Sequence, residues 1–67
     1  MKLKEYLYQD VRIINDEGYS FDGYVAEFFR GEDNEDGIDS IGVSKDAEHR
    51  GGIEISENYI VSIQIIK

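Results

Sequence analysis

The sequence has no cysteine, no proline and no tryptophan, and it has fewer than half as many basic as acidic side chains. Without cysteine, the chain forms no disulfide and offers no thiolate to a metal. Without proline, it has no proline-rich linker that would separate two domains. We therefore expect its 67 residues to form a single domain, 1–67, held together by a well-filled apolar core.

Long hydrophobic runs are missing as well. No stretch approaches the ~20 consecutive apolar residues that a membrane-spanning helix needs. The basic start at residues 1–4 is followed at once by acidic and polar side chains, which is unlike a signal peptide. We expect a soluble, cytoplasmic protein that does not contact a membrane.

Positive charge is scarce. The net charge is −8, from fifteen acidic and seven basic side chains. An acidic surface repels phosphate groups and favours solubility, so nucleic-acid binding is not expected. No two basic residues are adjacent, so the sequence indicates no basic patch: Lys2, Lys4, Arg12, Arg30, Lys45, Arg50 and Lys67.

The composition is that of a β protein, because ten Ile, four Val, three Phe and five Tyr stand against two Leu. Asp16-Glu17-Gly18 predicts a hairpin turn with positive φ at the glycine, and Gly23 predicts a bend or bulge in a long strand. The spacing of Leu3 and Leu7 indicates a short helix over residues 3–8. Apolar alternation predicts five strands: 11–15, 19–29, 40–44, 52–57 and 61–66.

So short a helix cannot cover a sheet, and we expect the five antiparallel strands to bend into a small barrel. The interruption Ser56-Glu57-Asn58 is interpreted as a tight corner that lets the last strand switch sheets and close the barrel. The predicted fold is mainly β, with a short N-terminal helix. The predicted core comprises Val11, Ile13, Phe21, Val25, Ile41, Val43, Ile53, Ile55, Ile63 and Ile65.

Two stretches resemble the Sm-like (LSm) family of small barrels. "VRIINDEGYSFDGYV" resembles its first motif, with Gly18, Gly23 and Val25 at the matching spacing, and "GIEISENYIVSIQI" resembles its fourth and fifth strands. The chain is similar in character to short Sm-like proteins of Gram-positive bacteria and their phages. The resemblance implies a helix followed by five bent strands and, as a function, RNA binding by a ring. The same pattern also suits SH3-like barrels.

The RNA-contacting positions of that family do not carry over. Phe29 stands where the family has Asp, and Asp33 stands where it has Asn, with Asn34 one residue late. Ser56 and Glu57 occupy the place of its Arg-Gly pair, where glutamate would repel a phosphate. Asn34 is the remaining nucleic-acid candidate.

The segment "EDNEDGID" at 32–39 imitates the start of a calcium loop, with Glu32, Asn34 and Asp36 before a glycine. Position 12 of that loop requires a bidentate Glu and here holds Val43. We expect no specific metal site. The alternatives are a solvated hairpin loop and a weak, non-selective ion site.

No catalytic residue and no cofactor are expected. The single histidine, His49, is interpreted as an exposed turn residue, and no serine has the G-x-S-x-G surroundings of a nucleophile elbow. A small filled barrel also lacks the deep pocket that raises the pKa of a catalytic carboxyl group. We expect a protein that is not an enzyme.

Tyr24 and Phe28 are predicted to share the outer face of the long strand, where they would form an aromatic patch unless the N-terminal helix covers them. The leading hypothesis is a non-enzymatic acidic module that binds an unknown protein, with a small homo-oligomer left open. The alternatives are an Sm-like RNA-binding ring and an acidic DNA mimic that inhibits a nucleic-acid-binding protein. The interaction candidates are Tyr24, Phe28, Glu32, Asp33, Asp36 and Asp39.

Overall fold

The computed structural model describes residues 1–45 and 52–66, and these contain five strands and three single turns of 3-10 helix. Each predicted strand is confirmed to within one residue at either end. The turn predicted after residue 45, including His49 and Arg50, lies almost entirely outside the described residues. The elements are η1 (Leu3–Tyr6), β1 (Asp10–Asn15), β2 (Ser20–Phe29), η2 (Gly31–Asp33), β3 (Ser40–Ser44), β4 (Ile53–Ser56), η3 (Glu57–Tyr59) and β5 (Ile60–Ile65).

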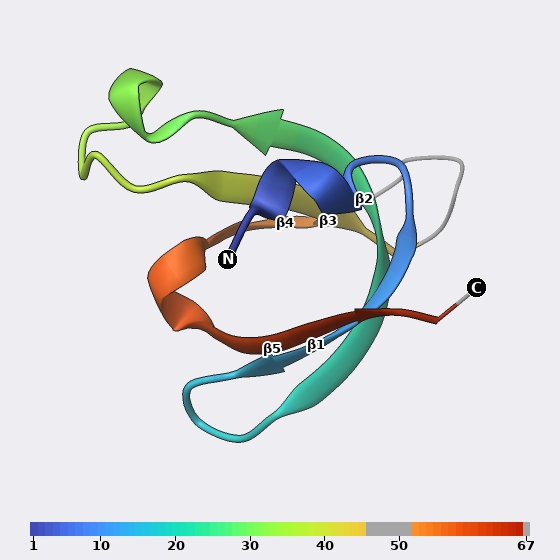
Figure 1. Cartoon of the computed structure of the whole chain (residues 1–67). Coiled ribbons are helices and arrows are strands. Elements are labelled where there is room, and N and C mark those ends of the chain that lie inside the picture. Colours follow the sequence, from blue (N-terminus) through green and yellow to red (C-terminus); the bar gives the residue numbers. More distant parts are fainter. Residues whose placement is uncertain (46–51, 67) are drawn as a thin grey trace.

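All five strands belong to one antiparallel sheet in the order β4-β3-β2-β1-β5, and the sheet is strongly curled (Figure 1). The hairpin between β1 and β2 is built as the sequence indicates. Gly18 has φ +85°, and the Asn15 side-chain oxygen accepts hydrogen bonds from the N–H groups of Glu17 and Tyr19 at 3.0 and 2.9 Å. A small polar residue before the turn and a glycine inside it therefore fix the hairpin.

The predicted closure of the barrel is wrong. β4 and β5 lie at opposite edges of the sheet and are not hydrogen-bonded to each other. The corner predicted at residues 56–58 does exist, one residue later, as η3. It carries the chain from one edge of the sheet to the other, so the two strands that it joins diverge instead of pairing (Figure 1).

The predicted N-terminal helix is also wrong, because residues 3–6 form only one 3-10 turn. Leu7 already has extended backbone angles (φ −58°, ψ 131°). So short a helix has little intrinsic stability, and packing of Leu3, which is 1% exposed, accounts for its place over the sheet. No helix in residues 1–45 and 52–66 has the length and apolar character required to cross a bilayer.

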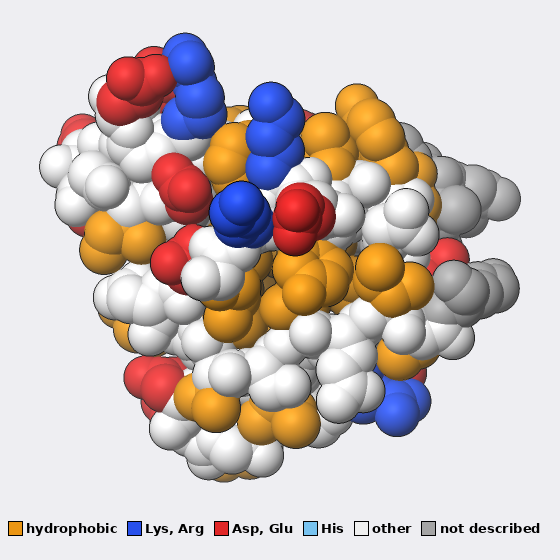
Figure 2. Space-filling view, viewed as in Figure 1, with side chains coloured by type: hydrophobic (Ala, Val, Ile, Leu, Met, Phe, Trp, Pro, Cys, Tyr) orange, Lys and Arg blue, Asp and Glu red, His pale blue; other side chains and the backbone are white. Residues whose placement is uncertain are grey.

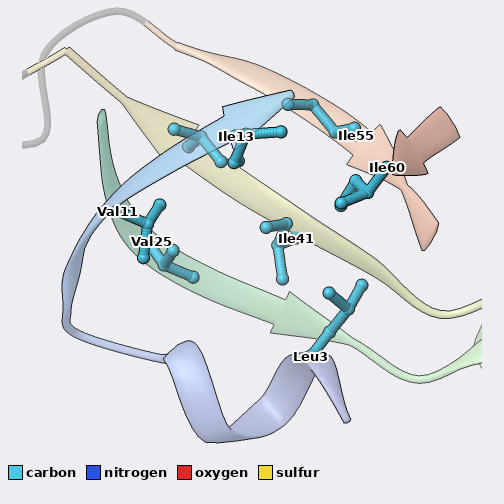
Figure 3. Packing of buried hydrophobic residues seen from close by; sticks show 8 residues of the cluster. Leu3, Val11, Ile13, Val25, Ile41, Ile55 and Ile60 are labelled. Atoms are coloured by element: carbon cyan, nitrogen blue, oxygen red, sulfur yellow. The ribbon is translucent and has the colours of Figure 1, made fainter. Parts of the chain in front are cut away.

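The apolar core lies inside the curl of the sheet, where side chains from all five strands and η1 point toward one another (Figure 3). Six predicted core residues are confirmed, and Phe21 and Ile63 are partly buried against them. Leu3 and Ile60 were missed because each lies at an element boundary, where alternation gives little information. The buried hydrophobic residues are Leu3, Val11, Ile13, Val25, Ile41, Val43, Ile55 and Ile60.

Two predicted core residues, Ile53 and Ile65, are instead 58% and 50% exposed. Ile53 pairs with the buried Val43, and Ile65 pairs with the buried Val11. Cross-strand partners point to the same face of a sheet, so both isoleucines lie on the core face. They are exposed because each belongs to an edge strand with no further strand beyond it.

A bulge in β2 changes which face its aromatic residues occupy. The pairing with β3 shifts between Val25, opposite Val43, and Glu27, opposite Gly42. The extra residue reverses the alternation, so Phe28 pairs with the buried Ile41 and packs against the core. The prediction that Tyr24 and Phe28 share the outer face is therefore wrong.

One exposed ion pair connects β1 and β2. The Arg12 guanidinium donates to both carboxylate oxygens of Asp22, at 2.8 and 3.1 Å. The side-chain hydrogen bond from Arg12, assisted by its positive charge, lowers the pKa of Asp22. A carboxyl group whose pKa is lower in the folded state contributes stability at neutral pH, and this is lost as the pH falls through the folded-state pKa.

We predict that Asp22 titrates below the ordinary aspartate pKa of about 3.9, and that Arg12→Gln returns it to that value. The carboxyl carbon shift of Asp22 in an NMR titration measures this. Because both side chains are half-exposed, added salt should weaken the effect. An unchanged Asp22 pKa in Arg12→Gln would show that the ion pair does not persist in solution.

Candidate protein-interaction surfaces

A surface groove near the N-terminus, here called the N-terminal groove, has a volume of about 590 Å³. It lies between η1 and the loop that follows β2. Figure 2 shows basic side chains gathered on this face next to exposed hydrophobic ones. Its lining mixes the Phe28 ring and the Met1 side chain with charges of both signs: Lys2, Lys4, Glu5, Arg30, Glu32 and Asp39.

The structure brings together three of the six predicted interaction residues. Phe28, Glu32 and Asp39 line the N-terminal groove, and the bulge in β2 is what turns the Phe28 ring toward it. Tyr24 lies further back along β2, opposite Asp10 and Ser44. The predicted surface is therefore divided.

The remaining two predicted residues belong to the loop from residue 30 to 39 and are used within it. Asp33 forms an ion pair with Arg30 at 3.3 Å. The Asp36 carboxylate accepts a hydrogen bond from the Ile38 N–H at 3.0 Å. The Asp39 carboxylate, at the groove, accepts one from the Gly31 N–H at 2.6 Å. The acidic loop is thus shaped by its own carboxylates.

Asn34, the nucleic-acid candidate, holds this loop to the sheet. Its side-chain amide donates to the Ile38 carbonyl at 2.7 Å and to the Ser40 hydroxyl at 3.3 Å. The buried Ser40 hydroxyl in turn donates to Glu54 of β4 at 2.7 Å. The amide therefore has a structural use, and binding a base with it would require breaking these hydrogen bonds.

Calcium is not expected to bind tightly to residues 32–39. Within residues 1–45 and 52–66, no three acidic, histidine or cysteine side chains converge as metal ligands. We predict that titration with calcium gives no saturable change in the amide signals of residues 33–39 at micromolar concentrations, the range typical of calcium sensors. Saturable shifts in that range would establish a specific site.

A second groove, here called the β4-edge groove, lies beside the free edge of β4. Its volume is about 270 Å³. Residues of β4 form one side, and the β1–β2 hairpin and η3 form the other. Among the residues of 1–45 and 52–66 that line it, four are large and apolar, three are acidic and none is basic: Phe21, Ile53, Ile55 and Tyr59, then Asp16, Glu17 and Glu54, together with Asn15.

A further hollow of about 260 Å³ adjoins this groove and shares Phe21 and Ile53 with it. It extends the hollowed surface past the start of β4 toward Ser44 and Gly52. Asp22 and Lys45 also line it, and Asp22 is already paired with Arg12. The exposed side of Ile53 therefore faces both hollows, and of the two only the β4-edge groove has acidic residues without a described basic one.

The opposite edge of the sheet is apolar but carries no charge. Val61 and Ile65 of β5 are 65% and 50% exposed, and Ile66 follows them at 40%. The strand sequence, IVSIQI, has no ionisable side chain. The two free edges thus differ in electrostatics although both expose apolar residues.

The β4-edge groove was missed by sequence reasoning because β4 and the central strands show the same alternation. The strand β4 is only four residues long and has the charged Glu54 between two isoleucines, and both features are typical of edge strands.

Comparison with protein-family models, with curated proteins and with solved structures found no match to this chain.

Proposed function

We propose that the protein is a non-enzymatic interaction module that binds another protein through its exposed strand edges. The observation that carries this proposal is the exposure of Ile53 and Ile65, two core-face side chains at the free edges of the sheet. An added strand would cover such a side chain and would pair with the free backbone groups of the edge.

The N-terminal groove provides a second contact surface in this proposal. The Phe28 ring, half-buried, gives it an apolar centre, and Glu32 and Asp39 give it acceptors. Apolar centres with polar borders are typical of protein interfaces. Catalysis, cofactor binding and metal binding have no place in this proposal.

The second candidate is the Sm-like RNA-binding ring. The glycine spacing of the β1–β2 hairpin and the free edges β4 and β5 favour it, because head-to-tail pairing of those edges in neighbouring copies would complete a barrel. The net charge of −8, the structural use of Asn34 and the carboxylate of Glu57 oppose the RNA-binding part.

Capture from cell extract tests the leading proposal. The immobilised protein is compared with Ile53→Lys and Ile65→Lys, which place a charge on each apolar edge, and with Gln9→Lys, which adds the same charge at an exposed residue before β1 that lines neither described groove. A captured protein lost with either edge variant but retained with Gln9→Lys supports the proposal. Capture unaffected by both edge variants contradicts it. A captured nucleic-acid enzyme would favour the acidic-mimic alternative.

Generic RNA should not bind. We predict no saturable change in the anisotropy of labelled oligo-U near physiological salt, because the net charge is −8 and Arg30, one of the three basic residues at the N-terminal groove, is already paired with Glu32 and Asp33. Light scattering should give the mass of a monomer or a small oligomer. A hexamer or heptamer that binds oligo-U below about 1 μM, near −8 kcal/mol, would replace the leading proposal with the RNA-binding ring.

A further inference from the structure

We propose that the β4-edge groove binds an extended segment of a partner protein in which lysine or arginine alternates with apolar residues, and that this segment adds to β4 as a sixth strand. The inference rests on the proposed function and specifies its ligand. Its basis is the juxtaposition of a free strand edge, an apolar floor and charges that, in the described part of the chain, are all acidic at this groove.

The free edge supplies backbone pairing. β4 is hydrogen-bonded to β3 on one side and to no described strand on the other. Alternate residues of an edge strand direct their N–H and C=O groups outward. With four residues in β4, the added strand needs only about four paired residues, or roughly 13 Å of extended chain.

The apolar floor supplies burial for every second side chain of the added strand. Ile53 is 58% and Tyr59 53% exposed, while the neighbouring Ile55 is only 8% exposed and fixes the strand in the core. Phe21, from the start of β2, is half-buried and borders both hollows beside β4. Apolar residues that face inward from the added strand would cover Ile53 and Phe21, extending the core.

The charges select the other side chains of the ligand. Asp16, Glu17 and Glu54 are exposed, and none forms an ion pair with a residue in the described part of the chain. Asp16 and Glu17 are held in the hairpin turn, where the Asp16 N–H donates to the Tyr59 carbonyl at 3.0 Å. These carboxylates are therefore positioned beside the groove, and they would attract lysine or arginine and repel an acidic segment.

The β5 edge and the N-terminal groove lack this combination. The strand β5 has no ionisable side chain with which to choose between basic and acidic ligands. The N-terminal groove contains Lys2, Lys4 and Arg30 beside its acids, so it would not favour a basic segment. A hollow on the other face of β4 is lined by Phe29, Glu27 and Glu54, so the acidic and apolar character extends to both faces of this edge. Of the three surfaces, only the β4 edge therefore favours alternating basic and apolar residues.

The experiment uses the full chain and a fluorescein-labelled peptide, acetyl-Lys-Val-Lys-Val-Lys-Val-Lys-amide. Two matched peptides replace every Lys by Glu, or carry N-methyl groups on alternate backbone nitrogens, which removes strand pairing and keeps the side chains. We expect the first peptide to bind with a Kd of order 100 μM, and both controls to bind at least about tenfold more weakly. Amide shifts in an NMR titration should map to residues 15–21 and 53–59.

Three variants locate the site. Ile53→Lys should weaken binding at least about tenfold, since it removes the apolar floor and adds a repelling charge, and Glu17→Lys should weaken it about three- to tenfold. Glu5→Lys makes the same change of charge in the N-terminal groove and should alter Kd by less than about twofold. Thermal melting checks that each variant is folded. Glu17 is exposed in a turn, so that variant keeps the test valid if Ile53→Lys is destabilised.

Absence of saturable binding up to about 1 mM, equal binding of the N-methylated peptide, or equal loss in Glu17→Lys and Glu5→Lys would each overturn the inference. The proposed function fails separately. Capture of a partner that is lost with Ile65→Lys, but is indifferent to the basic peptide and to Glu17→Lys, would uphold the interaction module and reject this ligand.

Discussion

Ile55→Ala should lower the free energy of unfolding by about 2–5 kcal/mol, the range for truncating a buried isoleucine. Ile55 is 8% exposed and pairs with the fully buried Ile41 in the adjacent strand. A domain of this size has a total stability of only about 5 kcal/mol or somewhat more. Its melting temperature should therefore fall by at least about 8 °C, and the domain is at risk of unfolding at room temperature.

The matched control is Ile53→Ala, the same substitution two residues earlier in the same strand. Ile53 is 58% exposed, so its truncation should cost less than about 1 kcal/mol, within the range of strand propensities. Thermal and urea unfolding followed by circular dichroism measure both variants. If Ile55→Ala melts within a degree or two of the wild-type protein, or if Ile53→Ala is equally harmful, the assignment of the core is wrong.

Gly23→Ala is the second substitution with a large expected effect. A Cβ atom at this buried position would collide with the Val43 side chain and would lie 2.9 Å from the Ser44 carbonyl oxygen. The Val43 methyl group can rotate away, but Ser44 belongs to the strand paired with β2. Relief would require separating the two strands locally, so we expect a loss of about 1–3 kcal/mol.

Gly42→Ala provides the comparison within the same pair of strands. Its added Cβ would lie 3.4 Å from the Cβ of Glu27 and 3.7 Å from the Phe29 ring, which are ordinary contacts. Because glycine destabilises a strand by roughly 0.5–1 kcal/mol relative to alanine, this variant should be neutral or slightly stabilised. Equal melting temperatures for Gly23→Ala and Gly42→Ala would contradict the close approach of β2 and β3 at Gly23.

The prediction from Gly23 was correct about the kind of feature, an irregularity in the long strand, and wrong about its position. The glycine correctly indicated an irregularity in the long strand, but the bulge lies at residues 25–27. Gly23 is required by the approach of β3. A sequence pattern reports that a side chain is not tolerated and does not report which neighbour excludes it.

The candidate site was less predictable than the strands. Phe28 was singled out as part of an outer aromatic face, but it lines the N-terminal groove because one extra residue in β2 reverses the alternation. The acidic loop was recognised by its composition, while the hydrogen bonds that occupy Asn34, Asp36 and Asp39 depend on backbone geometry. Ile53 was assigned to the core because its alternation is identical to that of a central strand.

The sequence by itself determined the number, type and approximate bounds of the strands, because alternation of apolar residues and the turn chemistry at Gly18 are local properties. It also determined the net charge of −8. Only the tertiary structure decided that the sheet stays open, with β4 and β5 at its two edges. The exposure of Ile53 and Ile65 follows from that order of strands, since burial depends on neighbours that are distant in sequence and leave no trace in the local pattern.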